Sequence, residues 1–405
     1  MTTSTRSGHE AEPGRVRQHY IDWVRILAVL LLIPFHTARI FNLAEAGVPE
    51  PFYAKSQALS WPLSHLIVFL DGWHMPLLFA VAGAATWYAL GFRSAGQYAG
   101  ERFKRLFIPF VFGVLVIVPP QTFFGSIANH NYDGSFLGYW PHFFTDESED
   151  LTGYAGGFTP GHLWFIAYLF LFAVLGLPLM LYFRRESGAR LVSRIAAFCR
   201  RPGAIFLFAV PLLAADYLVG DAADPNPLRH LLFFLAGYLV VADVRFQDAI
   251  DRHKGAALLF GAAAATVINS FWALDIGLGG EYAPQHVALR LLGNLNAWLW
   301  IVAILGYGRR FLNVDNRVLR YANEAAYPFY ILHQTVIVAI GFYVLKWELP
   351  VPAAFSFIAL ASLIASLAVY DLLVKRVGVL CFLFGMKQAP AARRAVQRQA
   401  VPAMP

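Results

Sequence analysis

The stretch RILAVLLLIPFH, residues 25–36, indicates the fold class of this chain. It begins with an arginine, ends with a histidine and is apolar between them, inside a longer apolar segment that covers residues 21–41. A helix of about 20 apolar residues crosses the hydrocarbon core of a bilayer, so this segment is long enough to span a membrane. A simple anchor gains nothing from Arg25 and His36, and ionisable groups inside a span mark function by default.

The composition of the whole chain is that of a membrane protein. Of its 405 residues, 58% are hydrophobic and only 14% are charged, whereas soluble domains carry about 25% charged residues. The two cysteines, Cys199 and Cys381, lie far apart beside basic residues. We therefore expect reduced thiols on the cytoplasmic side, with neither a disulfide framework nor a metal-binding spacing.

Ten segments are candidate membrane-spanning helices, which predicts an all-α, polytopic membrane helix bundle. They cover about residues 20–42, 70–91, 105–121, 161–183, 203–220, 228–243, 255–275, 286–307, 325–346 and 352–374. The stretch SQALSWPLSHLIVFLD, residues 56–71, which leads into the second of these segments, is a candidate interfacial or re-entrant helix. We expect one membrane domain over residues 20–376, between a disordered cytoplasmic N-terminal tail, 1–19, and a cytoplasmic C-terminal tail, 377–405.

A cleaved signal peptide is the alternative for the first apolar segment, because Ala44-Glu45-Ala46 has the small residues of a cleavage site. The segment is longer than the apolar region of a signal peptide, and many further spans follow it. An uncleaved first helix is therefore the preferred interpretation.

Lysine and arginine are distributed unevenly between the two sides of the ten helices. If the N-terminus is cytoplasmic, 26 of the 32 Lys and Arg residues fall in inside segments and five in outside segments. Basic residues accumulate on the cytoplasmic side, which predicts two cytoplasmic termini and a multi-pass protein of the cytoplasmic (inner) membrane. The net charge of +7 is then a topology signal, and we expect no nucleic-acid partner.

The longest outside segment, about residues 122–160, contains no lysine or arginine and is rich in Gly, Asn, Asp and aromatic residues. Such a loop suits a neutral, sugar-like ligand, although a solvated loop with interfacial aromatics explains the same composition. Its glycines lack the GxxxxGK[ST] pattern of a nucleotide-binding loop.

Arg25 and His36 are eleven residues apart, which is very nearly three turns of helix. Both should therefore face the same way, about 16 Å apart along the axis. The alternatives are an arginine that extends to the lipid headgroups and a structural, hydrogen-bonded histidine.

Other polar residues gather at four places in the predicted spans. Asp71 and His74 have the spacing of one helix face, where the carboxylate would orient the imidazole. The remaining candidates are His162 and Trp164 at the start of the fourth span, Asn294 and Asn296 in the eighth, and Tyr327, Tyr330 and His333 in the ninth. Without cysteine ligands or an H-E-x-x-H helix, we expect no metal.

The stretch ERFKRLFIPF carries Arg102, Lys104 and Arg105 at the cytoplasmic mouth of the third span. Ordinary positive-inside charge explains these residues without any function. The alternative is an anion clamp, because guanidinium groups match phosphate oxygens in pairs.

Together these pieces resemble the acyltransferase-3 family of integral membrane acyltransferases over nearly the whole chain. An arginine and a histidine separated by ten residues in the first span mark that family, as Arg25 and His36 do here. HMPLLFAVAG (74–83) is similar to the family's second-span block, HLWFIAYLF (162–170) to its fourth and NEAAYPFYILHQTVIVAIGFYVL (323–345) to its ninth. The last two blocks most resemble the branch of glucan-biosynthesis succinyltransferases.

The resemblance implies a catalytic pair, Arg25 and His36, and a donor-binding pair, Arg102 and Arg105. His36 would act as general base or as acyl carrier. The co-substrate would be acyl-CoA, as acetyl-CoA or succinyl-CoA, with no bound cofactor, and the acceptor a hydroxyl of an extracytoplasmic carbohydrate or similar compound. One departure concerns the donor site, because Glu101 stands where the family's arginine motif begins with a basic residue.

Two other functions fit parts of the pattern. A membrane transporter of an acyl group or small anion would also use polar residues inside the bundle, but the chain lacks the internal repeat typical of that class. A membrane scaffold leaves the recurrent intramembrane polar residues unexplained. Besides the lipid bilayer, the expected partners are acyl-CoA and the acceptor, and nothing in the sequence specifies an oligomeric state.

Overall fold

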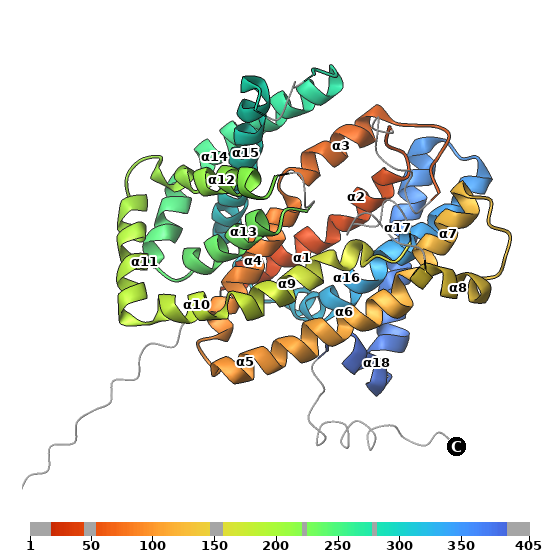
Figure 1. The fold of residues 1–405 in the computed structure, drawn as a ribbon, viewed down its shortest axis with the longest axis horizontal. Helices are drawn as coiled ribbons and strands as arrows, with labels where there is room; N and C mark the ends of the chain where they lie inside the picture. Colours follow the sequence, from red (N-terminus) through yellow and green to blue (C-terminus); the bar gives the residue numbers. More distant parts are fainter. Residues whose placement is uncertain (1–17, 44–53, 146–156, 221–224, 278–281, 387–405) are drawn as a thin grey trace, which may run out of the picture.

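The computed structural model describes residues 18–43, 54–145, 157–220, 225–277 and 282–386, which form helices and no β-strand. Figure 1 shows their arrangement. The α-helices are α1 (His19–Leu30), α2 (Leu32–Arg39), α3 (Trp61–Asp71), α4 (His74–Ala89), α5 (Ala95–Arg102), α6 (Ile108–Phe112), α7 (Pro119–Asn129), α8 (Phe136–Thr145), α9 (Trp164–Leu175), α10 (Leu177–Arg184), α11 (Glu186–Cys199), α12 (Ala209–Val219), α13 (Pro227–Val240), α14 (Val244–Ala273), α15 (Pro284–Phe311), α16 (Arg317–Val344), α17 (Val351–Val369) and α18 (Gly378–Leu383).

The all-helical membrane fold is confirmed, and within the described residues seven helical runs are long and apolar enough to cross a bilayer. They are His19–Arg39, Trp61–Ala89, Ala95–Asn129, Val244–Ala273, Pro284–Phe311, Arg317–Trp347 and Val351–Val374. An eighth span is formed if α9 and α10, bent by 50°, count as one. Two further apolar helices, Ala204–Val219 and Pro227–Val240, are shorter. The count of ten spans and the orientation of the bundle stay predictions.

Several spans are broken, and proline explains two of the breaks. Pro34 cannot donate a backbone hydrogen bond and its ring crowds the carbonyl four residues earlier, and α1 and α2 are separated at Leu31. Pro178 has the same relation to the break at Gly176 between α9 and α10. The sequence predicted that Asp71 and His74 lie on one helix face. A third break, at Gly72–Trp73, separates α3 from α4 between them, so the two residues lie on different helices.

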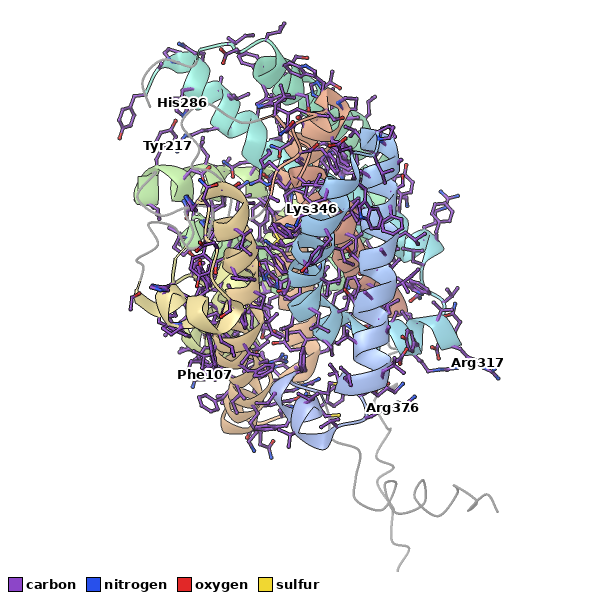
Figure 2. The ribbon with its side chains drawn as sticks, turned by 90° about the vertical axis from the view of Figure 1, so that its right-hand side faces the viewer. Phe107, Tyr217, His286, Arg317, Lys346 and Arg376 are labelled. Atoms are coloured by element: carbon purple, nitrogen blue, oxygen red, sulfur yellow. The ribbon has the colours of Figure 1, made fainter. Side chains whose placement is uncertain are left out.

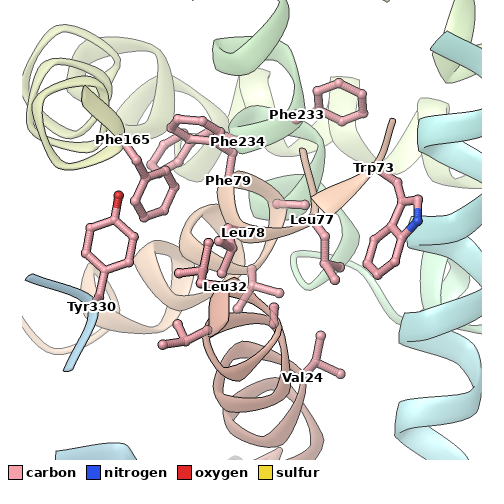
Figure 3. Packing of buried hydrophobic residues seen from close by; sticks show 14 of the residues in the cluster. Val24, Leu32, Trp73, Leu77, Leu78, Phe79, Phe165, Phe233, Phe234 and Tyr330 are labelled. Carbon is pink, nitrogen blue, oxygen red and sulfur yellow. The ribbon is translucent and has the colours of Figure 1, made fainter. Parts of the chain in front are cut away.

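The centre of the bundle is α4, which packs against α1, α9, α13 and α15. Its closest neighbour is α13, and glycine permits the approach. A Cβ atom on Gly83 would lie 1.8 Å from the Phe234 carbonyl oxygen, and one on Gly237 would lie 1.8 Å from the Ala80 oxygen. Small residues at facing positions let helix backbones pack closely in membranes. Figure 3 shows the large apolar side chains around this contact.

The two ends of the bundle differ in charge. Figure 2 shows Arg317 and Arg376 at one end, together with Phe107, and Tyr217 and His286 at the other. We call the first the basic end, because the predicted inside residues Arg102 and Arg105 lie just before Phe107 in sequence. The helix α16 begins at the basic end, and its far end is joined by the 3-10 turn Leu345–Trp347 to the returning helix α17.

Candidate active site

A cavity of about 550 Å³ lies between α1, α4, α5, α9 and α16. Towards the basic end its wall is polar and includes Arg25, Arg102, Arg105, Arg320 and Asn323. Towards the middle of the bundle its wall is apolar or aromatic and includes Val29, Leu78, Phe165, Phe234 and Tyr330. The cavity is therefore cationic at one end and apolar at the other.

The arginines of the cavity are held in different ways. Arg25 donates to the Asn323 side-chain oxygen at 2.6 Å and lies 3.4 Å from the Asp22 carboxylate. The Arg105 guanidinium donates to the Gly385 carbonyl at 3.1 Å and to Glu101 at 3.2 Å. Arg102 instead stacks over the Tyr98 ring at 4.7 Å. Its charge is thus placed by an aromatic face, with no ion pair among the described residues.

Glu101, the departure from the expected basic motif, forms ion pairs with both Arg93 and Arg105. Part of the Arg105 charge is therefore already neutralised within the protein. Lys104, in the same short stretch, is exposed and does not line the cavity. Of the three basic residues expected near the mouth, Arg102 and Arg105 reach the cavity and Arg102 retains the more available charge.

Tyr330 forms the inner end of the cavity. Its ring lies 5.6 Å from that of Phe165, between centroids, and 5.5 Å from the His333 imidazole. Figure 3 shows Tyr330 and Phe165 beside each other. The Tyr330 hydroxyl donates to the backbone carbonyl of His162. Tyr330 therefore separates the cavity from the histidines behind it.

Three histidines from distant parts of the sequence meet behind Tyr330. The rings of His36 on α2 and His333 on α16 lie 5.1 Å apart, and those of His333 and His162 also lie 5.1 Å apart. His162 belongs to the 3-10 turn Gly161–Leu163 that precedes α9. We call these three residues the histidine cluster. The sequence indicated each of them separately but not that they are neighbours.

Two members of the histidine cluster have their nitrogens engaged by the backbone. His333 Nδ1 donates to the Tyr330 carbonyl at 2.6 Å, and His162 Nε2 donates to the Ile331 carbonyl at 3.0 Å. These donors fix the tautomers, because a carbonyl oxygen only accepts. His36 makes no hydrogen bond within the described part of the chain. Neither of its ring nitrogens is held by the backbone, so both are available to a proton or an acyl group.

A second group of polar residues surrounds His162 on the side away from the basic end. The Gln121 amide lies 3.3 Å from His162 Nδ1 and donates to Thr335 Oγ1 at 2.7 Å. Thr335 in turn donates to the Ile117 carbonyl at 2.6 Å. Sequence reasoning did not single out Gln121 or Thr335, although a polar residue inside a predicted span is the signal that would have indicated them.

The other candidates lie elsewhere. His74 Nε2 donates to the Ala28 carbonyl at 2.6 Å, and Asp71 lies at an exposed position beyond the break. Trp164 packs against His230, with ring centroids 5.4 Å apart, and does not line the cavity. Asn294 is buried and donates to the Asp216 carboxylate at 2.5 Å. Arg25 and Val29 continue the face that leads to His36, but His36 itself is not in the cavity wall.

No group of three His, Cys, Asp or Glu side chains in the described ranges could hold a metal ion. The histidine cluster is included in this result, although its rings lie close together.

The fold and site define a multi-pass membrane protein in which an arginine-lined cavity leads to a buried histidine cluster. Residues 18–371 match the family described as Acyltransferase domain. The chain therefore belongs to the acyltransferase-3 family, which confirms the resemblance, and it is an acyltransferase rather than the transporter considered as an alternative.

Curated relatives of similar length support the assignment. The chain is 20% identical over 345 residues to the glucans biosynthesis protein C of Salmonella schwarzengrund (strain CVM19633) and to that of Salmonella typhi. In both cases the match covers 81% of this chain and 84% of the relative. No solved structure matches the chain significantly.

Proposed function

We propose that the protein transfers an acetyl- or succinyl-type acyl group from cytoplasmic acyl-CoA to a hydroxyl of an extracytoplasmic carbohydrate or related acceptor. The observation that carries this proposal is the cavity, which is lined by Arg25, Arg102 and Arg105 and ends at Tyr330, beside the histidine cluster. An acyl-CoA has phosphates at one end and a thioester on a long, thin arm. It therefore matches a cavity that is cationic at its mouth and apolar within.

Each arginine has a separate proposed role towards the donor. Arg102 binds phosphate oxygens, because guanidinium groups form paired hydrogen bonds with them and its charge is not taken up by a carboxylate. Arg105 contributes less charge, because it shares Glu101. Arg25, held by Asn323, lies on the face of α1 that leads towards His36 and guides the arm of the donor.

His36 performs the chemical step in one of two ways. As general base, it removes the proton of the acceptor hydroxyl while the oxygen attacks the thioester carbonyl and the carbon–sulfur bond breaks. As acyl carrier, its ring nitrogen attacks the thioester first and passes the acyl group to the hydroxyl in a second step. The unengaged nitrogens of His36 support both routes.

The carbohydrate acceptor is supported by two observations. The relatives carry glucans biosynthesis in their names. In addition, α7, α8 and the connection between them, in the segment expected outside the membrane, bring together the rings of Phe123, Tyr132, Phe136 and Tyr139. Aromatic faces suit the apolar faces of sugar rings, and Phe123 lies on α7, the helix that also carries Gln121, beside His162.

The test is acyl transfer by the purified protein in detergent, measured as release of CoA thiol from acetyl-CoA and succinyl-CoA. His36→Ala should lower kcat by about 10²–10⁴-fold, the usual contribution of a general base, while donor still binds. Arg25→Ala should mainly raise KM for the donor. Both variants should elute as the unaltered protein does in size-exclusion chromatography.

Mass spectrometry of surface glycans from cells with and without the protein then identifies the acyl group and the acceptor by their mass difference. Normal turnover in His36→Ala would contradict the proposed chemistry. An unchanged glycan profile would contradict the proposed acceptor class while leaving the donor chemistry to the first assay.

A further inference from the structure

One face of α17 carries a row of buried hydroxyl groups that the acyl-transfer chemistry does not use, and the row extends into the turn that follows the helix. Ser362, Ser366 and Tyr370 follow at intervals of four residues, and each is 0% exposed. Their hydroxyls make no hydrogen bond to any described residue. Ser356 on the same helix is the contrast, because it is exposed and donates to the Pro352 carbonyl at 2.7 Å. A serine on α17 can thus donate a hydrogen bond to a backbone carbonyl of its own helix, but the two buried serines do not.

Further groups of this kind lie on the helices α2 and α16, which both pack against α17. Thr37 Oγ1, His333 Nε2 and Gln334 Oε1 are likewise buried and without a partner among the described residues. His333 lies 11 residues before the end of α16 at Val344, and Ser362 lies 11 residues after the start of α17 at Val351. Because one turn joins these antiparallel helices, both residues lie at the same depth, about 16 Å from the turn.

The row ends at the basic end of the bundle. The Tyr370 ring lies 6.0 Å from that of Tyr321, whose hydroxyl donates to the Asp371 carboxylate at 2.7 Å. The Asp371 side chain is 43% exposed. Unsatisfied groups are therefore found both at the histidine cluster and beside a carboxylate in contact with solvent.

Energetics indicate what satisfies these groups. Inside the hydrocarbon layer each unsatisfied polar group costs several kcal/mol, and buried water is the usual partner of such groups. Residues four apart on a helix are about 6 Å apart along its axis. One water molecule with two hydrogen bonds of about 2.8 Å spans roughly that distance. We propose that a file of bound water molecules lies between α2, α16 and α17 and connects His333 Nε2 with Tyr370.

The role of this water file rests on the proposed function. During transfer the acceptor hydroxyl loses its proton to an imidazole, the ester carbon–oxygen bond forms, and the thioester carbon–sulfur bond breaks. The sulfur leaves as a thiolate that must gain one proton, so one proton passes from oxygen to sulfur overall. The donor fills the cavity on the Tyr330 side of α16. The water file gives the proton a second route between the histidine cluster and the basic end.

Radiolytic hydroxyl-radical labelling of the full-length protein in detergent tests the water file directly, because radicals formed from bound water oxidise the side chains beside it. Tyr370 should be oxidised several-fold more than Tyr238. Tyr238 is the matched control, because it is equally buried at 0% exposure but donates to the Met180 carbonyl at 2.9 Å. Equal labelling of the two tyrosines would overturn the proposal.

A variant of Ser366 tests whether the file carries the proton. Ser366→Ala, which adds no volume, should lower turnover without changing the donor KM and should raise the solvent deuterium isotope effect. Ser356→Ala should change none of these values. If Ser366→Ala behaves like Ser356→Ala, the file does not carry the proton. If the unaltered protein transfers no acyl group, the proposed function fails, but the labelling result still decides whether the water is present.

Discussion

A side chain that already forms a hydrogen bond or an ion pair within the protein is less available to bind a substrate. In the histidine cluster, His162 and His333 each use a ring nitrogen to hold a backbone carbonyl, and His36 does not. At the cavity mouth, Arg105 is committed to Glu101 and Gly385, and Arg102 only stacks on Tyr98. Residue type and spacing predicted the candidates in both places, but the division of roles depends on contacts across the bundle.

The first residue-scale prediction compares Arg102 with Lys104. Arg102→Ala should weaken acyl-CoA binding by about 1.5–3 kcal/mol, the contribution of a hydrogen bond to a charged group, which is roughly a 10- to 150-fold higher Kd. Lys104→Ala removes the same formal charge two residues away, but Lys104 is exposed and outside the cavity. The Kd of the Lys104→Ala variant for acyl-CoA should therefore change by less than about twofold.

Equilibrium binding of acyl-CoA to the purified variants measures this difference. Arg102→Lys is the second comparison, because it keeps the charge but not the paired donors of a guanidinium, and it should lie between the unaltered protein and Arg102→Ala. Equal losses in Arg102→Ala and Lys104→Ala would mean that only net charge matters, and the phosphate contact would be refuted.

At the scale of elements, the breaks in the helices position the site. The three-turn spacing of Arg25 and His36 predicted a shared face on one helix, and Arg25 does lie at the cavity. Helical geometry is interrupted only at Leu31 between them, within one run from His19 to Arg39, and His36 lies on α2 beside His333, so the shared face stays a prediction. The break at Gly72–Trp73 was not predicted, because hydrophobic periodicity does not reveal where a helix is interrupted.

The short segment after α18 closes the cavity mouth, and glycine at 385 makes this possible. Gly385 has φ +64°, and a Cβ atom there would lie 2.8 Å from the Arg105 carbonyl oxygen and 2.9 Å from the Tyr327 ring. Gly385→Ala should therefore destabilise this segment by at least about 1–2 kcal/mol, which is the cost of a left-handed conformation for an ordinary residue. Because Arg105 donates to the Gly385 carbonyl, the donor KM should also rise.

Gly203→Ala separates the two effects. Gly203 has φ +74°, a Cβ atom added there would meet no other atom within 4 Å, and the residue lies outside the cavity wall. This variant should lose similar thermal stability in detergent and retain the donor KM of the unaltered protein. A normal KM in Gly385→Ala would show that the segment does not shape the donor site.

At the scale of the whole molecule, hydropathy predicted the positions of the helices better than it predicted which helices cross the membrane. Each of the ten predicted segments contains helix in the structure, but Ala204–Val219 and Pro227–Val240 are both shorter than the runs that can span. At about 1.5 Å per α-helical residue, and about 2.0 Å per residue over the 3-10 turn Ala204–Phe208, these two helices are about 27 and 21 Å long, short of a hydrocarbon layer of about 30 Å. The meeting of His36, His162 and His333 was beyond the sequence, because one sequence contains no information on which helices pack together.

Orientation is the remaining property of the whole molecule, and it is predicted from charge. The basic end should face the cytoplasm, because 26 of 32 Lys and Arg residues fall in the segments assigned to that side. Phe92, before α5, and Tyr282, before α15, offer a matched pair for cysteine labelling, since they are 82% and 77% exposed. The native thiols give little background, because both are buried and burial raises the pKa of Cys199 to about 11.

The labelling uses cells whose outer envelope admits the reagent while the membrane that holds the protein stays closed. A membrane-impermeant maleimide should then react with Tyr282→Cys, which lies in a segment assigned to the outside. Phe92→Cys should react only after the membrane itself is opened. Cysteine variants at both positions must first retain acyl transfer, so that the orientation measured is that of the folded protein. Labelling of Phe92→Cys in intact cells would place Arg102 and the cavity mouth outside, where a cytoplasmic acyl-CoA cannot reach them, and would contradict the donor proposal together with the topology.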